Sequence, residues 1–183
     1  MKIGLLRHFK VTRGYPNKIV TSAELMQWIK EYDASDVEEN EIDLCDIKWN
    51  ICYASDLSRA EITARKAFEG EIIFLEELRE IPLSPFFRKN IRLPLPVHLL
   101  FIRIAWLFNH KSQPLSKKDV SRRINMILDK VLEQDDNVLI VSHGGVMMFM
   151  RKELMKRGFT GPKFRTADNG KLYIFKNGEG KSS

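Results

Sequence analysis

Short apolar runs alternate along this sequence with stretches that have the apolar periodicity of amphipathic helices. The runs have the length and composition of strands, and they cover residues 2–6, 51–54, 71–75, 138–142 and, more weakly, 171–176. Strands that alternate with helices form a mostly parallel sheet with helices packed on both faces. The sequence therefore predicts a three-layer α/β/α fold.

Helices fill the gaps between these strands. Capping boxes, in which a Ser or Thr and an acidic residue three positions later satisfy each other's backbone N–H groups, begin at Thr21 and Ser116. Two further helices directly follow strands, over 57–68 and 146–157. The whole chain, residues 1–183, is expected to form one domain, since this length can bury a single core without metal or disulfide staples.

A proline-rich stretch at about 82–115 interrupts the alternation and encloses an apolar helical segment at 97–108. That segment is shorter than the roughly 20 residues a membrane span needs, so we predict a buried or partner-facing helix. His98 and His110 flank it and are expected at a helix end or on the surface. We predict that the stretch is a lid inserted over the sheet. If the apolar helix of this lid lined a ligand-binding pocket, it would favour a phosphate ester that carries an apolar or bulky group.

Charge and cysteine content narrow the class of protein. Thirty basic residues against 24 acidic ones give a net charge of +6, which favours anionic ligands. Basic pairs on the predicted helices, such as Arg122 with Arg123, are expected to be solvated, and there is no nucleic-acid-binding motif. Neither Cys45 nor Cys52 has neighbours at zinc-ligand spacing; we expect the second to be buried and inert. We expect a cytoplasmic protein that binds neither nucleic acid nor membrane, with a frayed tail at 176–183.

Side chains suited to binding phosphate fall just past the carboxyl ends of the predicted strands. Arg7 and His8 end the first strand, and Arg59 lies in the first turn of the helix that follows the second. His143 ends the fourth strand and is followed by Gly144. Because the carboxyl ends of parallel strands meet at one edge of the sheet, where ligands bind, we expect these residues to lie together.

Such a set suits phosphoryl transfer. Arginines bind phosphate oxygens with paired N–H donors, and a glycine lets backbone N–H groups come close. A neutral imidazole can attack phosphorus, and nearby positive charge lowers its pKa so that it stays neutral. A carboxylic acid would protonate the leaving oxygen and later accept a proton from water. Three glutamates after the third strand are candidates for this acid: Glu76, Glu77 and Glu80.

At these positions the sequence resembles the histidine phosphatase superfamily, the phosphoglycerate-mutase-like branch 1. The resemblance is carried, in the family's order, by residues 5–8, 55–60, 78–80 and 141–145. It implies that His8 is the phosphorylated nucleophile, that Glu80 is the acid/base, with Glu77 as the alternative, and that no metal or organic cofactor takes part. It also implies that phosphate is held by Arg7, Arg59, His143 and Gly144.

Two departures from the family pattern leave the function open at a finer level. Phe9 stands where the family usually has glycine. The asparagine that many members have a few residues further on is also missing, because Asn17 lies too far along the chain to be aligned with that position. We predict a phosphatase acting on a small phosphorylated metabolite. A phosphoprotein substrate, a mutase-type phosphoryl transferase, and a module that binds a phosphorylated ligand with little turnover remain as alternatives.

Overall fold

The structure is a computed structural model that describes residues 1–87 and 89–177. The chain divides into two compact units, each described here by itself. The first unit comprises Met1–Lys10, Val37–Glu80 and Arg123–Ser183, and the second comprises Val11–Asp36 and Ile81–Arg122. The stretch predicted as an insertion therefore forms a unit together with an early segment of the chain. Its action as a lid stays a prediction. The predicted frayed tail is wrong at 176 and 177, which end a strand, and its positions 178–183 lie outside the described residues.

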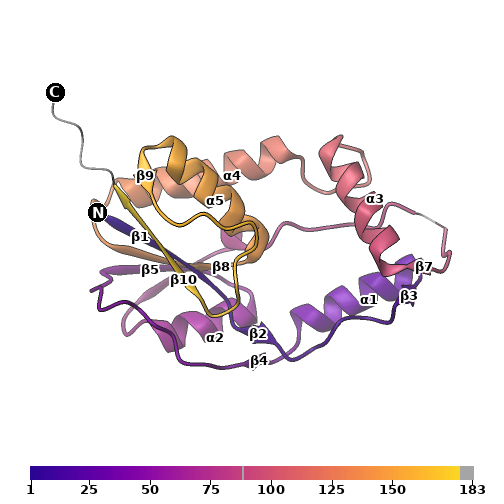
Figure 1. Ribbon diagram of the computed structural model, residues 1–183, viewed down its shortest axis with the longest axis horizontal. Helices are drawn as coiled ribbons and strands as arrows, with labels where there is room; N and C mark the ends of the chain where they lie inside the picture. Colours follow the sequence, from indigo (N-terminus) through magenta and orange to yellow (C-terminus); the bar gives the residue numbers. More distant parts are fainter. Residues whose placement is uncertain (88, 178–183) are drawn as a thin grey trace. The chain divides into compact units, whose positions relative to one another are not determined.

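A mixed six-stranded sheet forms the centre of the first unit (Figure 1). Its strands, in spatial order, are β6 (Ile72–Leu75), β5 (Ile51–Ser55), β8 (Val138–Ser142), β1 (Lys2–Arg7), β10 (Leu172–Asn177) and β9 (Phe159–Thr160). The first four are parallel, and β10 and β9 each pair antiparallel. The predicted α/β fold is confirmed. All five predicted strands occur within one residue of their expected bounds.

Helices cover both faces of this sheet, with α2 (Ser58–Ala67) on one side and α5 (Gly144–Lys156) on the other (Figure 1). Three alanines of α2 are buried against side chains of the sheet. These side chains come from every second residue of a strand, the residues that point to the face covered by α2. These contacts form one cluster, made of Leu6, Trp49, Cys52, Ala54, Ala60, Ala64, Ala67, Leu139 and Val141. As expected, Cys52 is fully buried, and burial raises the pKa of its thiol to about 12.

Gly4 in β1 allows the Trp49 ring to pack directly on the strand. A Cβ at position 4 would lie 2.7 Å from Cη2 of Trp49 and 2.9 Å from Cδ1 of Leu172, closer than real Cβ contacts. The smallest residue is therefore required at this position of β1.

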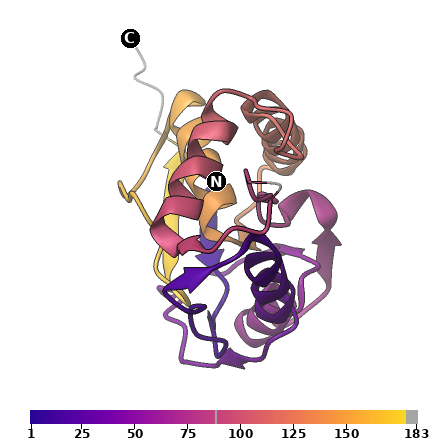
Figure 2. The ribbon, with the colours of Figure 1, turned by 90° about the vertical axis from the view of Figure 1, so that its right-hand side faces the viewer.

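The second unit is built from α1 (Ser22–Asp33), α3 (Leu95–Leu107) and a pair of two-residue strands, β3 (Ile19–Val20) and β7 (Leu93–Pro94). Its core cluster contains Val20, Leu25 and Ile102. Figure 2 shows α1 and α3 toward the viewer. Helix α4 (Lys117–Leu132) begins in this unit and continues into the first, where η1 (Glu76–Leu78) also lies. Two further short strands, β2 (Lys10–Val11) and β4 (Val37–Glu38), pair separately.

Both predicted capping boxes are present. The Thr21 hydroxyl accepts the Glu24 N–H at 3.1 Å, and the Glu24 carboxylate accepts the Thr21 N–H at 2.7 Å. Ser116 and Asp119 exchange the same two contacts at 3.2 Å each. Each box satisfies N–H groups that the first helical turn would otherwise leave without partners.

His98 lies at a helix end, one of its two predicted positions. It is in the first turn of α3, and its side chain is fully buried. Its Nε2 lies 2.9 Å from the Val20 carbonyl oxygen, which can only accept, so Nε2 is the donor. This hydrogen bond links α3 to β3. His110 is exposed, as expected. Within residues 1–87 and 89–177, no helix has the length and apolar composition needed to cross a bilayer.

Candidate active site

His8 follows β1 directly, and its imidazole is almost completely buried. Its Nδ1 lies 2.6 Å from the carbonyl oxygen of Phe9. Because a carbonyl oxygen only accepts hydrogen bonds, Nδ1 carries the ring hydrogen. The lone pair of the neutral ring is therefore on Nε2, the nitrogen that can act as a nucleophile.

Burial and neighbouring positive charge keep this imidazole neutral. Burial has the largest effect and, with the charges of Arg59 and Arg7, lowers the pKa of His8 to about 3, although the bond to Phe9 opposes the shift. The pKa of His143 is held well below its ordinary value by burial, then by Arg59 and the other cations nearby. Both rings are therefore uncharged at neutral pH in the free protein.

His143 stands beside His8 at the junction of β8 and α5. The two ring centroids are 5.0 Å apart, with an angle of 53° between the ring planes. Nε2 of His143 lies 2.9 Å from the Ser55 hydroxyl, which comes from the end of β5. Nδ1 of His143 is buried and has no hydrogen-bond partner among the residues that the structure describes. This nitrogen is available to an oxygen atom of a bound ligand.

Arg7 and Arg59 supply positive charge to both imidazoles. Arg7 is the last residue of β1, and its Nη1 donates to the Ala167 carbonyl at 2.6 Å. Arg59 is the second residue of α2, and only 3% of its surface is exposed. A Cβ at Gly144 would lie 3.4 Å from Cζ of Arg7, so the guanidinium packs closely against the start of α5. Two guanidinium groups and two neutral rings make the site positive, as binding of a phosphate dianion requires.

Of the three candidate glutamates, Glu80 lies at the start of α5. Its Oε2 accepts the backbone N–H of Gly145 at 3.1 Å, so its carboxylate sits at a helix N-terminus two residues after His143. Glu76 is exposed and pairs with Arg79 at 3.2 Å, and Glu77 is exposed on the short helix η1. The structure therefore brings together all six predicted site residues, and it places Glu80, unlike the exposed Glu77, at the start of α5.

Arg123, which sequence reasoning missed, also lies at this site. The predicted solvated position is wrong, because the side chain is half-buried and its Nη2 donates to the Arg79 carbonyl at 3.0 Å. Burial lowers its pKa while the charges of Glu80 and Glu77 raise it, and its own charge acts on His143. Position 123 lies three residues after Val120 and four before Ile127, both buried, so helical periodicity already places it at the edge of the apolar face.

Comparison with protein families matches residues 37–183 to the histidine phosphatase superfamily (branch 1). The chain belongs to the histidine phosphatase superfamily. The matched range begins after Arg7 and His8, so the family roles expected for these two residues stay predictions.

Solved structures with the same fold include several phosphatases. One is the alpha-ribazole phosphatase from Shigella flexneri, with a TM-score of 0.57 and 19% identity over 95% of this chain and 89% of that one. Another is the phosphoserine phosphatase from Entamoeba histolytica in complex with 3-phosphoglyceric acid, with a TM-score of 0.56 and 20% identity over 96% of this chain and 90% of that one. A third is a mycobacterial glucosyl-3-phosphoglycerate phosphatase, with a TM-score of 0.57 and 16% identity over 94% of this chain and 88% of that one. At these identities the likeness establishes the fold alone. A search of curated proteins finds no match to this sequence.

Phe9, which replaces the usual glycine of the superfamily, fits this site through its backbone and its buried ring. Its N–H donates to the Thr63 hydroxyl at 2.9 Å, and that hydroxyl donates to the Arg59 carbonyl at 2.7 Å. The ring is fully buried against Gly170, where a Cβ would lie 3.4 Å from it and where φ is +68°, a conformation that favours glycine. The larger side chain is thus accommodated in the core, without occupying the hydrogen-bonding positions of the His8 ring.

Asn169 is a second residue that sequence reasoning missed. Its Nδ2 donates to the carbonyl oxygen of His8 at 2.9 Å and lies 3.3 Å from that of Phe9. It comes from the loop before β10, and no motif or periodicity marked it. Among residues 1–87 and 89–177, no three His, Cys, Asp or Glu side chains gather as metal ligands would.

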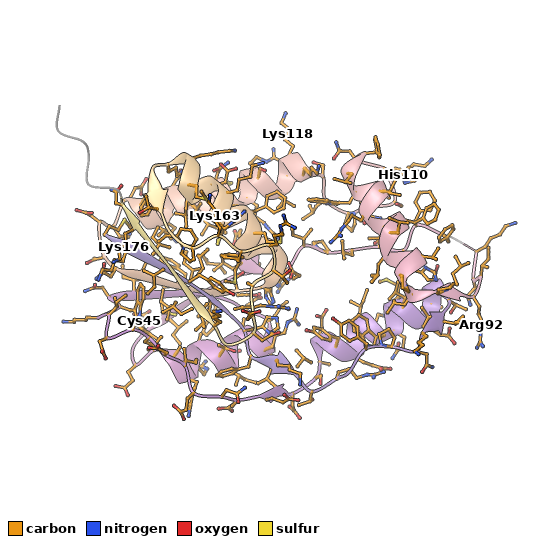
Figure 3. The ribbon with its side chains drawn as sticks, in the orientation of Figure 1. Cys45, Arg92, His110, Lys118, Lys163 and Lys176 are labelled. Carbon is orange, nitrogen blue, oxygen red and sulfur yellow. The ribbon has the colours of Figure 1, made fainter. Side chains whose placement is uncertain are left out.

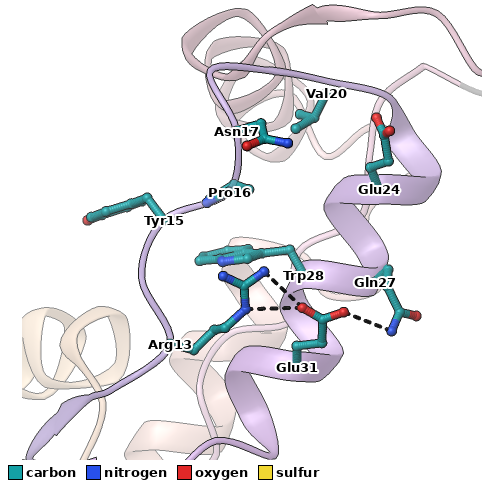
Figure 4. Close-up of a pocket in the computed structure, with 9 residues that line it drawn as sticks. All are labelled: Arg13, Tyr15, Pro16, Asn17, Val20, Glu24, Gln27, Trp28 and Glu31. Atoms are coloured by element: carbon teal, nitrogen blue, oxygen red, sulfur yellow. Dashed lines mark hydrogen bonds and ion pairs between the residues drawn. The ribbon is translucent and has the colours of Figure 1, made fainter.

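A separate pocket of about 250 Å³ lies within the second unit, between residues 13–20 and helix α1 (Figure 4). Asn17, the asparagine that could not be aligned, lines it. Two charged residues of its wall bond to each other, since Glu31 accepts from Arg13 at 2.9 Å, and Glu31 also accepts from Gln27 at 3.1 Å.

Proposed function

We propose that this protein is a phosphatase that hydrolyses a phosphate monoester through a phosphohistidine intermediate on His8. The observation that carries the proposal is the state of the His8 ring, neutral and with its lone pair on Nε2. Arg7 and Arg59, which bring positive charge to this ring, are suited to hold the phosphoryl oxygens through the displacement.

In the first step, Nε2 of His8 forms a bond to phosphorus while the ester P–O bond breaks. The Glu80 carboxylic acid gives its proton to the departing oxygen. The ring becomes positively charged because Nδ1 keeps its hydrogen, and the Phe9 carbonyl, already 2.6 Å away, stabilises that charge. Nδ1 of His143, in the tautomer that carries hydrogen there, donates to a phosphoryl oxygen.

In the second step, water attacks phosphorus and gives a proton to the Glu80 carboxylate. The bond between Nε2 and phosphorus breaks, and the ring returns to its neutral form as inorganic phosphate leaves. Glu80 regains the proton that it lost in the first step, so the cycle closes without metal or cofactor. This exchange requires Glu80 to alternate as acid and base. The Gly145 N–H that its carboxylate accepts favours the charged form, in which Glu80 acts as the base.

The proposed substrate is a small phosphorylated metabolite. The likeness to structures named as phosphatases of phosphoserine, alpha-ribazole phosphate and glucosyl-3-phosphoglycerate supports this class. Identities of 16 to 20% do not carry one of those substrates over to this chain.

The test measures phosphate release from an aryl phosphate, sugar phosphates, nucleotides, phosphoglycerates and phosphopeptides. We expect turnover of at least one of them, abolished by His8→Ala and reduced by roughly 10²- to 10³-fold by Arg59→Ala, the usual scale for a lost transition-state donor. His110→Ala, which removes an exposed histidine, serves as the matched control and should leave the rate unchanged. A wild-type protein that binds phosphate and turns over nothing would instead be a binding module. Isomerised phosphoglycerate without free phosphate would indicate a mutase.

A further inference from the structure

Helix α3 exposes a continuous apolar stripe. Its outward positions recur at the helical spacing of three and four residues, and all are exposed: Pro96, Leu99, Leu100, Arg103, Ile104, Leu107 and Phe108. Leu100 is 56% exposed and Phe108 is 80% exposed. Arg103 is the one charged side chain in this stripe. An apolar patch of this kind on a folded surface marks a site that binds a partner or a membrane.

The opposite face of α3 is firmly packed inside the second unit. Ile102 and Ala105 are buried there, and His98 is bonded to the backbone of β3. Phe101 packs on two aromatic rings, with centroids 4.9 Å from that of Phe87 and 5.6 Å from that of Phe86. Because its inner face holds the helix in place, the outer stripe is a fixed surface of this unit.

Positive charge is concentrated in the segment that carries this helix. Residues 81–122 contain eight Lys and Arg and a single acidic residue, Asp119, whereas the rest of the chain contains 22 basic and 23 acidic residues. The excess positive charge of the protein therefore lies entirely in this segment. Arg92 and His110 lie beyond opposite ends of α3 (Figure 3). Arg92 pairs with Glu24 at 3.4 Å, and Lys111 is exposed just past the second end.

We propose that the outer stripe of α3 binds the surface of an anionic phospholipid membrane, with the helix axis in the plane of the bilayer. Apolar side chains would enter the headgroup boundary while Lys111, past the end of the helix, meets lipid phosphates. Arg103 can extend along the stripe and place its guanidinium at headgroup level. At 13 residues the helix is about 20 Å long, suited to lying on a bilayer and too short to cross it.

Charge also distinguishes this partner from a second copy of the chain. A two-fold pairing of α3 stripes would bring identical basic segments together and oppose like charges. The sequence-based expectation of no membrane partner depended on the lack of a spanning segment, and this proposal departs from it. This proposal is independent of the catalytic one, since no residue of the stripe belongs to the His8 site.

The test is co-sedimentation of the full chain with vesicles of phosphatidylcholine alone or with about 30% phosphatidylserine. We expect binding to the anionic vesicles only, weakened by salt. The triple variant Leu100→Gln, Leu107→Gln, Phe108→Gln should lower the partition coefficient more than tenfold. Its matched control is Met126→Gln with Met155→Gln, which alters two exposed methionines on other helices and should have no effect.

A second pair of variants tests the role of charge. Arg103→Glu with Lys111→Glu should lower binding by at least about 25-fold, since each basic side chain near an anionic surface contributes about fivefold. Lys163→Glu with Lys176→Glu changes the net charge equally in the first unit and should have a much smaller effect. Unchanged melting temperatures would show that the variants fold.

Three results would overturn the proposal. One is absence of binding to anionic vesicles, and another is equal binding to neutral ones. The third is a dimer in lipid-free solution, detected by sedimentation equilibrium, that the triple variant dissociates, because the stripe would then be an interface between copies.

Discussion

The reactivity proposed for His8 depends on a hydrogen bond to the next residue's backbone. The acceptor is the carbonyl oxygen of Phe9, which any amino acid at that position supplies. This explains in physical terms how a phenylalanine can replace the usual glycine without changing the tautomer of the His8 ring. The side chain at position 9 instead affects packing, through its contact with Gly170.

The low pKa of His8 makes a prediction about stability. In the unfolded chain the imidazole has its ordinary pKa of 6.5, whereas in the folded protein the pKa is about 3. Between these values the unfolded state binds more protons, so this residue makes the protein less stable as the pH falls. From pH 7 to about pH 4.5 the wild type should lose about 2 to 3 kcal/mol more free energy of unfolding than His8→Asn. Urea unfolding at several pH values measures this difference, and parallel curves would contradict the low pKa.

The assignment of the acid/base residue makes a second prediction at the residue scale. Glu80→Gln should reduce kcat by roughly 10²- to 10⁴-fold for an alkyl phosphate, whose leaving oxygen needs a proton. The loss should be smaller for an aryl phosphate, because its leaving group departs without full protonation. The control Glu77→Gln should stay near the wild-type rate. A reversed order of the two variants would assign the role to Glu77.

At the scale of elements, prediction from sequence succeeded where a pattern was long enough to show a period. The five main strands and both capped helices were predicted, because apolar runs and capping boxes are local signals. The strands β3, β7 and β9 have two residues each and carry no measurable period. Helix α5 begins at Gly144, two residues before the apolar pattern starts, with His143 as its N-cap and the Gly145 N–H directed to Glu80.

The packing of β1 makes a prediction at this scale. Gly4→Ala would place a methyl group within 2.7 Å of the Trp49 ring, so we expect a loss of about 1 to 3 kcal/mol in the free energy of unfolding. Gly14→Ala is the matched control, because a Cβ there meets no atom within 4 Å. Chemical denaturation measures both variants. Equal stability of the two would show that Trp49 does not pack as described.

At the scale of the whole molecule, the site was predictable because the topology of a parallel sheet gathers distant residues. Arg7 ends one strand while Arg59 and His143 follow two others, and the shared direction of those strands predicted that the three residues would meet. Arg123 and Asn169 reach the same place from a helix face and from a loop. At such positions tertiary packing, rather than a local sequence pattern, decides which way the side chain points. The positive charge of residues 81–122 was visible in the sequence, but the exposure of the α3 stripe required the structure.

The most direct test of the central claim is to trap the covalent intermediate. The protein is mixed with a phosphate ester that it hydrolyses, quenched in alkali, where phosphohistidine survives, and digested for mass spectrometry. We predict one added phosphoryl group on the peptide that contains His8, on Nε2 of the ring, and none in His8→Ala. Rapid turnover with no phosphorylated peptide, or a phosphoryl group on another residue, would contradict the account.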